Sequence, residues 1–209
     1  MKLSKKKISI VDYKGSNLLS LFNAFKYLGY QAEITSDSEI INKSDFIILP
    51  GVGSFAHSMT NLKKFNIDQI LTEKNITGES IIFGICLGMQ ILFSSSIEKE
   101  YTKGLSFFDA EVSKFEKNIK IPHMGFNSVS FNKNTKLFQG LPNNSDFYFA
   151  NSFKVNFEKK YSDFTSSTFY GEKFISAIEY KNIYATQFHP EKSHDIGLEV
   201  LKNLINLDA

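Results

Sequence analysis

Hydrophobic positions in the first half of the chain follow two alternating patterns. Short continuous apolar runs are typical of buried strands, and they occupy residues 8–11, 32–34, 46–49 and 81–85. The segments between and after these runs carry apolar residues at intervals of three and four, which predicts helices over residues 18–28, 54–75 and 87–93. Ser16 or Asn17 is expected to cap the first of these helices, and Gly29 to end it. Buried strands that alternate with helices predict the α/β class, with a central, mostly parallel sheet flanked by helices.

The second half of the chain has a different pattern. Between about residues 110 and 187 the apolar runs are short and rich in aromatic residues, and Asn, Ser, Gly and Pro separate them. This pattern predicts antiparallel strands and hairpins, for example over 147–149, 174–178 and 183–187. A last helix is predicted over 196–204. Because no repeat or linker interrupts the chain, we expect one domain over residues 1–209.

Composition narrows the class of protein. Of the 209 residues, 42% are hydrophobic and 22% are charged, which is ordinary for a globular protein and excludes a disordered or fibrous chain. No apolar run approaches the roughly 18 residues of a membrane span, so no membrane association is expected. All basic residues are Lys, which argues against nucleic-acid binding because that function relies on Arg. The one cysteine, Cys86, rules out a disulfide within the chain and favours a cytoplasmic protein.

The segment Gly84-Ile85-Cys86-Leu87-Gly88 joins a predicted strand to a predicted helix. This is the spacing of a nucleophile elbow, in which small residues flank a tight turn and the nucleophile is exposed at its tip. At a helix N-terminus, backbone N–H groups favour thiolate over thiol, and the Leu87 N–H would face an oxyanion. The pentapeptide alone leaves open a buried, inert cysteine beside two packing glycines.

A thiolate nucleophile needs a base and a group that orients the base. His189 follows a predicted strand and precedes Pro190 and Glu191, so Glu191 is placed to orient the ring, although a surface histidine beside a turn fits the same pattern. His57 and His194 are expected to have no catalytic role. The four histidines lack metal-ligand spacing, so no metal site is predicted.

A second candidate for oxyanion binding follows the third predicted strand. Pro50-Gly51-Val52-Gly53 places two glycines around one residue, so its N–H groups can turn freely. Taken alone, the segment also fits a simple turn between a strand and a helix.

Together these segments resemble the triad-type (class I) glutamine amidotransferases, and most of all the glutaminase subunits of imidazole glycerol phosphate synthases. The resemblance covers almost the whole chain. The motifs that carry it lie at residues 12–18, 50–55, 84–90, 121–127 and 189–193. It implies the class I amidotransferase fold and no cofactor.

The resemblance also implies roles for individual residues. Cys86 would attack the side-chain amide of glutamine, His189 would move the proton to ammonia, and Glu191 would orient His189. The oxyanion would be held by Gly51, Val52, Gly53 and Leu87. The glutamine would be bound by Gln90 and by the segment Asn151-Ser152-Phe153.

The family passes its ammonia to a cyclase-type (β/α)8 barrel synthase subunit, which implies a heterodimer. The residues that face that partner or line the route to it would be Tyr13, Asn17, Met124, Phe126, Asn127 and Asn151. Three positions depart from the family pattern: Lys14 replaces a glycine, Phe126 a tryptophan and Asn151 a histidine. These departures leave the triad intact but keep open a paralogue that feeds ammonia to a surface-sugar amidination pathway. A catalytically silent regulatory module and a cysteine hydrolase acting on peptides are the remaining alternatives.

Overall fold

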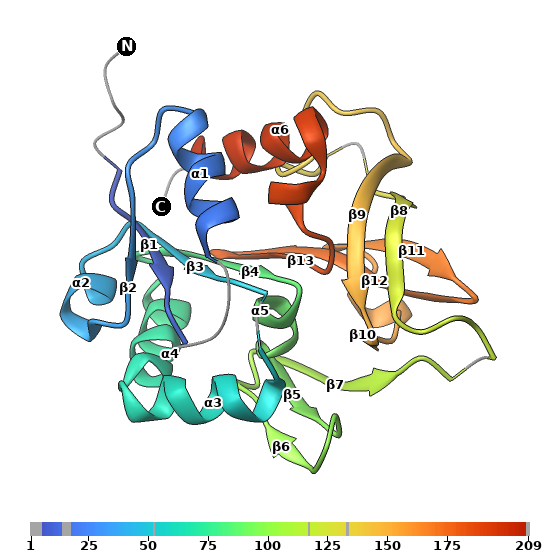
Figure 1. The fold of residues 1–209 in the computed structure, drawn as a ribbon, viewed down its shortest axis with the longest axis horizontal. Coiled ribbons are helices and arrows are strands. Elements are labelled where there is room, and N and C mark those ends of the chain that lie inside the picture. Colours follow the sequence, from blue (N-terminus) through green and yellow to red (C-terminus); the bar gives the residue numbers. More distant parts are fainter. Residues whose placement is uncertain (1–5, 14–17, 52, 117, 133, 208–209) are drawn as a thin grey trace.

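A computed structural model describes residues 6–13, 18–51, 53–116, 118–132 and 134–207 (Figure 1). Its centre is a seven-stranded sheet in the order β11-β12-β13-β4-β3-β1-β2. Five neighbouring strands run parallel: β1 (Ile8–Val11), β2 (Ala32–Thr35), β3 (Phe46–Leu49), β4 (Ile81–Ile85) and β13 (Ile183–Thr186). Two more, β12 (Glu172–Tyr180) and β11 (Thr165–Tyr170), extend the sheet antiparallel beyond β13. The predicted mixed α/β fold with a mostly parallel sheet is therefore confirmed.

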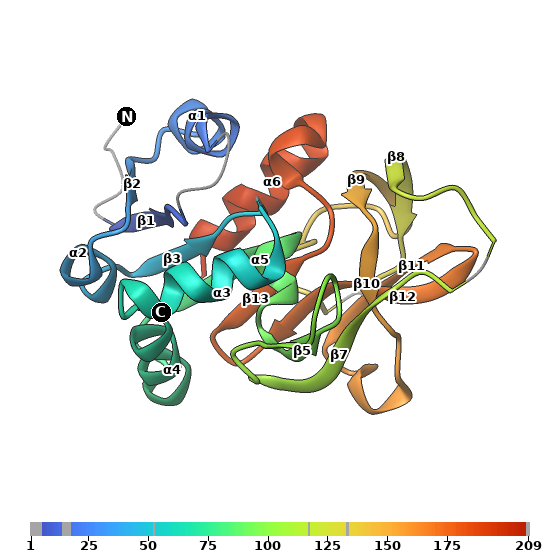
Figure 2. The same cartoon turned by 60° about the horizontal axis from the view of Figure 1, so that its bottom comes forward.

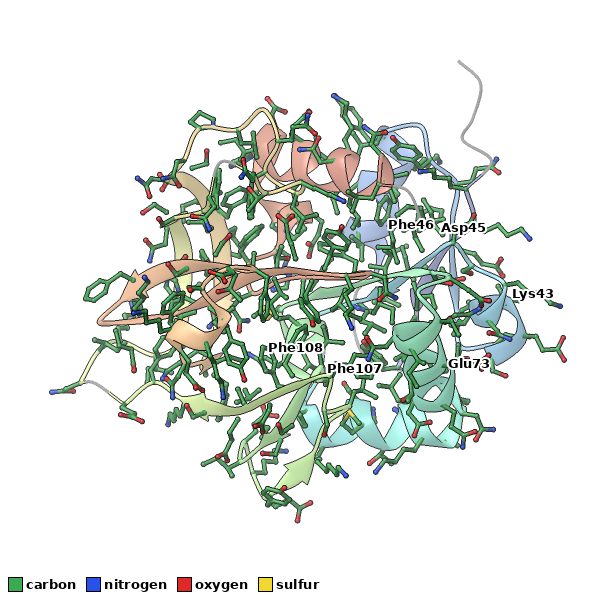
Figure 3. All side chains as sticks on the ribbon, turned by 180° about the vertical axis from the view of Figure 1, so that it is seen from behind. Lys43, Asp45, Phe46, Glu73, Phe107 and Phe108 are labelled. Carbon is green, nitrogen blue, oxygen red and sulfur yellow. The ribbon has the colours of Figure 1, made fainter. Side chains whose placement is uncertain are left out.

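Helices cover both faces of this sheet (Figures 1 and 2). One face packs against α1 (Leu19–Tyr27) and α6 (His194–Ile205), and the other against α3 (Phe55–Lys64) and α4 (Ile67–Thr77). The two resulting core layers are visible in Figure 3, where Phe46 belongs to the first and Phe108 to the second. Continuous apolar strands such as Phe46–Leu49 are buried on both faces, as parallel strands require.

The second half of the chain adds two smaller sheets. A four-stranded sheet has the order β10-β7-β5-β6, and β8 pairs with β9 as an antiparallel ribbon. The ribbon lies at the end of the molecule opposite α2 (Figures 1 and 2). The strands are β5 (Phe93–Ser96), β6 (Thr102–Lys103), β7 (Phe108–Lys114), β8 (His123–Val129), β9 (Ser145–Asn151) and β10 (Phe153–Val155). Two 3-10 turns, η1 (Lys159–Tyr161) and η2 (Pro190–Lys192), complete this half.

Several predicted helix boundaries are wrong. The helix predicted over 87–93 is only α5 (Leu87–Gln90), because Ile91 and Leu92 bond to the segment that leads into β7: Leu105 N donates to the Ile91 carbonyl and Phe107 N to the Leu92 carbonyl, both at 2.8 Å. The segment 54–75 is two helices separated at Asn66, whose φ is 57°. The short helix α2 (Ser38–Asn42), capped by Asp37, was not predicted.

The start of α1 also differs from the prediction. The N-cap position is Leu18, whereas the proposed caps Ser16 and Asn17 lie outside the described residues. The end of α1 agrees, because Gly29 follows it with a φ of 84°. In the described ranges, no helix combines the length and hydropathy of a membrane span.

Candidate active site

Cys86 occupies the sharp turn between β4 and α5. Its φ of 51° and ψ of −105° are strained for a residue with a side chain. A Cβ on Gly84 would lie 2.5 Å from the Gly88 carbonyl oxygen, and one on Gly88 would lie 1.9 Å from that of Leu49. Both glycines are therefore required by close backbone packing, which holds the elbow against the end of β3. Cys86 is 7% exposed.

The sheet order brings His189 to Cys86 although the two lie about a hundred positions apart. Strand β13 pairs parallel with β4, and Cys86 N donates to the Thr186 carbonyl over 2.6 Å. The chain leaving β13 therefore passes directly beside the elbow. His189 precedes η2, and its Nδ1 lies 2.8 Å from Glu191 Oε1. Its ring lies beside Cys86, because a Cβ on Gly51 would touch both side chains. Nδ1 faces Glu191, so Nε2 is the nitrogen that faces sulfur.

Opposing effects set the pKa of His189. Burial lowers the pKa, but the Cys86 sulfur and then the Glu191 carboxylate favour the charged ring and together raise the pKa from 6.5 to about 10. Glu191 is almost buried itself, so its charge acts on the ring with little screening by water. The raised pKa of His189 favours a charged imidazolium ring beside Cys86 at neutral pH.

The loop after β3 lies over the nucleophile. A Cβ on Gly51 would lie 2.6 Å from Cys86 Cβ and 3.1 Å from His189 Cε1. The backbone at Gly51 therefore lies too close to both side chains to leave room for a side chain of its own. Gly53 has a φ of 95°, a conformation that favours glycine. Val52 lies outside the described residues. On the other side of the sulfur, Leu87 is the first residue of α5, so its N–H has no partner within the helix.

A cavity of about 280 Å³ adjoins this loop, His189 and Glu191, and Ile85, the residue before Cys86, also lines it. Its lining includes Gly51, Gly53, Ile85, Ala150, His189 and Glu191. A larger cavity of about 840 Å³ lies between α1, β2 and α2, but none of the predicted site residues lines it. The smaller cavity is therefore the one in which a substrate could reach the predicted catalytic residues.

A buried polar network lies beneath the sulfur. Gln90 Nε2 donates to the Phe153 carbonyl at 3.0 Å and to Gln187 Oε1 at 2.9 Å. Asn151 Nδ2 donates to the same Phe153 carbonyl at 2.9 Å, and Gln187 Nε2 donates to Cys86 Sγ at 3.4 Å. Ser152 is half-buried at the bend between β9 and β10. Both N–H groups of Gln90 are used inside the chain, which leaves its Oε1 to accept a hydrogen bond from a ligand.

Sequence reasoning missed Gln187. The residue directly follows β13, where ligand-binding residues gather in α/β proteins, and this position was the available signal. Its contact with Cys86 depends on β13 lying next to β4, which residue patterns did not predict.

Some of the residues predicted at the partner interface are exposed in this chain and others are buried. Met124 and Phe126 project from β8 and are 65% and 49% exposed, and Asn127 is half-buried. Tyr13 and Asn151 are buried, at 1% and 5% exposure, so in the chain alone they present almost no surface to a partner. Tyr13 packs in the core with its carbonyl bonded to Asn61, and Asn151 belongs to the polar network. Asn17 lies outside the described residues.

The other histidines lie away from the sulfur. His57 on α3 bonds to Asn61, and His194 stacks on Phe126 with ring centroids 5.2 Å apart. His123 is buried between Phe149 and Tyr170. Within the described ranges, no group of three or more His, Cys, Asp or Glu side chains could hold a metal ion.

Comparison with known proteins places these features in a family context. A family model described as glutamine amidotransferase class-I matches residues 9–206. The imidazole glycerol phosphate synthase subunit HisH 1 of Campylobacter jejuni (strain RM1221) is 42% identical over 202 residues, which cover 96% of this chain and 100% of that protein. Subunit HisH of Methanocaldococcus jannaschii is 44% identical, over 96% of this chain and 99% of its own.

Solved structures share the fold at lower identity. A structure titled PurLQS from Thermotoga maritima aligns with a TM-score of 0.73 and 17% identity, covering 97% of this chain and 99% of its own. A structure described as a glutamine amidotransferase aligns with a TM-score of 0.71 and 17% identity, covering 94% of this chain and 98% of its own. The arrangement of strands and helices around the elbow is therefore one that solved proteins also adopt.

Proposed function

The chain belongs to the class-I glutamine amidotransferase family, and we propose that it is a glutaminase subunit that passes ammonia to a cyclase-type synthase subunit in histidine biosynthesis. The observation that carries the proposal is the position of the His189 ring beside Cys86, with its Nδ1 on Glu191. The names of the relatives, subunits of imidazole glycerol phosphate synthase, support the pathway. The synthase product would be imidazole glycerol phosphate together with AICAR.

In the first half of the reaction, the Cys86 thiolate attacks the side-chain carbonyl carbon of glutamine. The carbonyl oxygen gains negative charge, which the Leu87 N–H and the peptides of Gly51, Val52 and Gly53 would stabilise. The imidazolium of His189 donates its proton to the amide nitrogen, the C–N bond breaks, and ammonia leaves. A thioester on Cys86 and a neutral His189 remain.

In the second half, His189 acts as a general base. It takes a proton from water while the water oxygen bonds to the thioester carbon. The tetrahedral intermediate then expels the Cys86 thiolate and releases glutamate. Glu191 holds the ring orientation through both halves and stabilises its charged form.

The partner would dock against the exposed side chains of β8. Met124 and Phe126 are large, apolar and solvent-exposed, which is typical of a protein–protein contact. Such a complex would form from this chain, as one domain over residues 1–209, and a cyclase-type (β/α)8 barrel in the cytoplasm.

A paralogous role is the second candidate, although both members of a duplicated pair of relatives carry the name of the imidazole glycerol phosphate synthase subunit. Two proteins of one Methanococcus maripaludis strain, named HisH 1 and HisH 2, are 42% and 44% identical to this chain. The chain is thus similar to both members of a duplicated pair. Its Phe126 lies on the exposed face where the family carries Trp, and this favours testing a sugar-amidination partner alongside the cyclase.

The decisive experiment measures glutamate release from glutamine. The chain is assayed alone, with an imidazole glycerol phosphate cyclase, and with a sugar amidotransferase system. We expect weak activity alone and strong stimulation by the cyclase, and stimulation by the sugar system alone would assign the second candidate. Cys86→Ala should abolish release under every condition while the circular dichroism spectrum stays unchanged. Release at the unmodified rate in this variant would overturn the assignment.

Two further alternatives have their own readouts. A silent regulatory module would not react with a glutamine-like electrophile, whereas the glutaminase should be labelled at Cys86. A peptide-directed cysteine hydrolase would be labelled as well, but free glutamine would not protect it.

A further inference from the structure

Gln187 is the second side chain, after His189, that contacts the sulfur of Cys86. It follows the last residue of β13, which pairs with the last residue of β4, so it lies directly beside the elbow. Its side-chain amide is fully buried, and its Nε2 lies 3.4 Å from Cys86 Sγ. The contact is within hydrogen-bonding distance for a sulfur acceptor.

The orientation of this amide follows from its neighbours. The Phe153 carbonyl can only accept, so the group that Gln90 presents to it is Nε2. The second N–H of Gln90 then faces Gln187, which must present its oxygen in return, over 2.9 Å. Because Gln187 Oε1 accepts from Gln90, Gln187 Nε2 is the atom that faces the sulfur of Cys86.

We propose that Gln187 is a further catalytic residue, a donor that stabilises negative charge on Cys86 Sγ both in the free enzyme and when the thiolate leaves the thioester. The inference rests on the proposed glutaminase function for its second part. In that step the C–S bond breaks and its electron pair returns to sulfur. The Gln187 N–H then stabilises the negative charge on sulfur from one side, and the His189 ring stabilises it from the other. A neutral donor adds this stabilisation without adding a charge that would compete with the imidazolium.

The test uses the one cysteine of the chain as its own reporter. Alkylation by iodoacetamide, followed by mass spectrometry, reports on Cys86 alone. Gln187→Met keeps the length of the side chain but removes the donor, and Gln187→Glu keeps an acceptor for Gln90 but removes the donor. We expect about tenfold slower alkylation at pH 7 in Gln187→Met, as for loss of one bond to a charged group, and a larger decrease in Gln187→Glu. At high pH, where the thiolate forms without help, the rates should approach that of the unmodified chain.

The matched control is Ser176→Ala. Ser176 is fully buried on β12, and its carbonyl accepts from Gln187 N, but its hydroxyl has no partner among the described residues. Its alkylation should match that of the unmodified chain at both pH values. The kcat for glutamate release should fall about tenfold in Gln187→Met with KM little changed.

The outcomes separate this inference from the proposed function. Alkylation needs no turnover, so slow alkylation at pH 7 supports the donor role even if no glutamate is released. An unchanged ratio of alkylation rates at pH 7 and high pH, in either variant that retains its thermal unfolding transition, would overturn it. If Gln187→Met does not fold, Gln187→Glu alone decides, because Gln90 keeps its acceptor.

Discussion

Two buried histidines of this chain have opposite electrostatic behaviour. His189, beside the nucleophile, is 5% exposed, and His123, the first residue of β8, is 3% exposed. The pKa of His189 is raised from 6.5 to about 10, because the Cys86 sulfur and Glu191 outweigh the opposing effect of burial. The pKa of His123 is lowered from 6.5 to about 4 by burial. Burial acts in the same direction on both rings, so their charged neighbours make the difference.

Among the described residues, no charged neighbour contributes to the pKa of His123. Its ring is stacked between Phe149 and Tyr170, with centroids 4.7 and 4.0 Å away, and we call these three rings the aromatic stack. The Asn127 amide donates to the Phe169 carbonyl, which fixes its Nδ2 toward His123 Nε2. His123 therefore accepts from a neutral donor and carries its proton on Nδ1. The same residue type serves proton transfer in one region and packing in the other.

The strongest test of this contrast makes the same substitution in both regions. His189→Gln should lower kcat for glutamate release roughly 10⁴-fold, because the acid and base of both half-reactions is lost. His123→Gln should leave kcat within about threefold and instead lower the free energy of unfolding, since a buried aromatic stack is broken. Both are measured with the stimulating partner present. A comparable loss of kcat in His123→Gln would show that the two regions are not functionally separate.

Residue patterns predicted features that are local in the sequence and missed those that depend on contacts between distant segments. The elbow glycines, His189 and Glu191 are close in sequence to strand ends, so local pattern and family motif predicted where they would lie in the fold. The pattern did not predict that Gln187 reaches Cys86, because this depends on a parallel pairing between strands about a hundred residues apart. The pattern also did not predict the burial of Tyr13 and Asn151, because segments distant in the sequence pack over them.

The next test removes the charge that distinguishes His189. Glu191→Gln keeps an oxygen near Nδ1 but lowers the pKa of His189, so the imidazolium is lost at a lower pH. We expect kcat to fall roughly 10³-fold, and the alkaline limb of activity to move from near pH 10 toward neutrality. A pH profile of glutamate release measures both. An unshifted alkaline limb would mean that Glu191 does not set the charge of His189.

The aromatic stack predicts a loss of stability in acid. Above pH 6.5 His123 is neutral in both folded and unfolded chains, so its contribution to stability is complete. Below pH 6.5 the unfolded chain gains a proton that the folded chain takes up only near pH 4, so the free energy of unfolding should fall by roughly 3 kcal/mol over this window. Urea unfolding at several pH values measures the fall. His123→Phe, which keeps a ring in the stack and cannot titrate, should flatten this part of the curve, and a curve of unchanged slope would contradict the assignment.

The smallest effect comes from opening one side of the stack. Tyr170 is half-buried and covers the solvent side of His123, and its hydroxyl donates to the Lys120 carbonyl. Tyr170→Leu should cost about 1 kcal/mol of stability at pH 7, the usual worth of an aromatic pair. Because water would then reach the ring, the pKa of His123 should rise toward its ordinary value and the acid-induced loss should become shallower. The pKa of His189 should not change in this variant, since its charge is set by Cys86 and Glu191. Titration of the two rings by NMR distinguishes these outcomes, and a shift of both pKa values would mean that the aromatic stack and the nucleophile share one electrostatic environment.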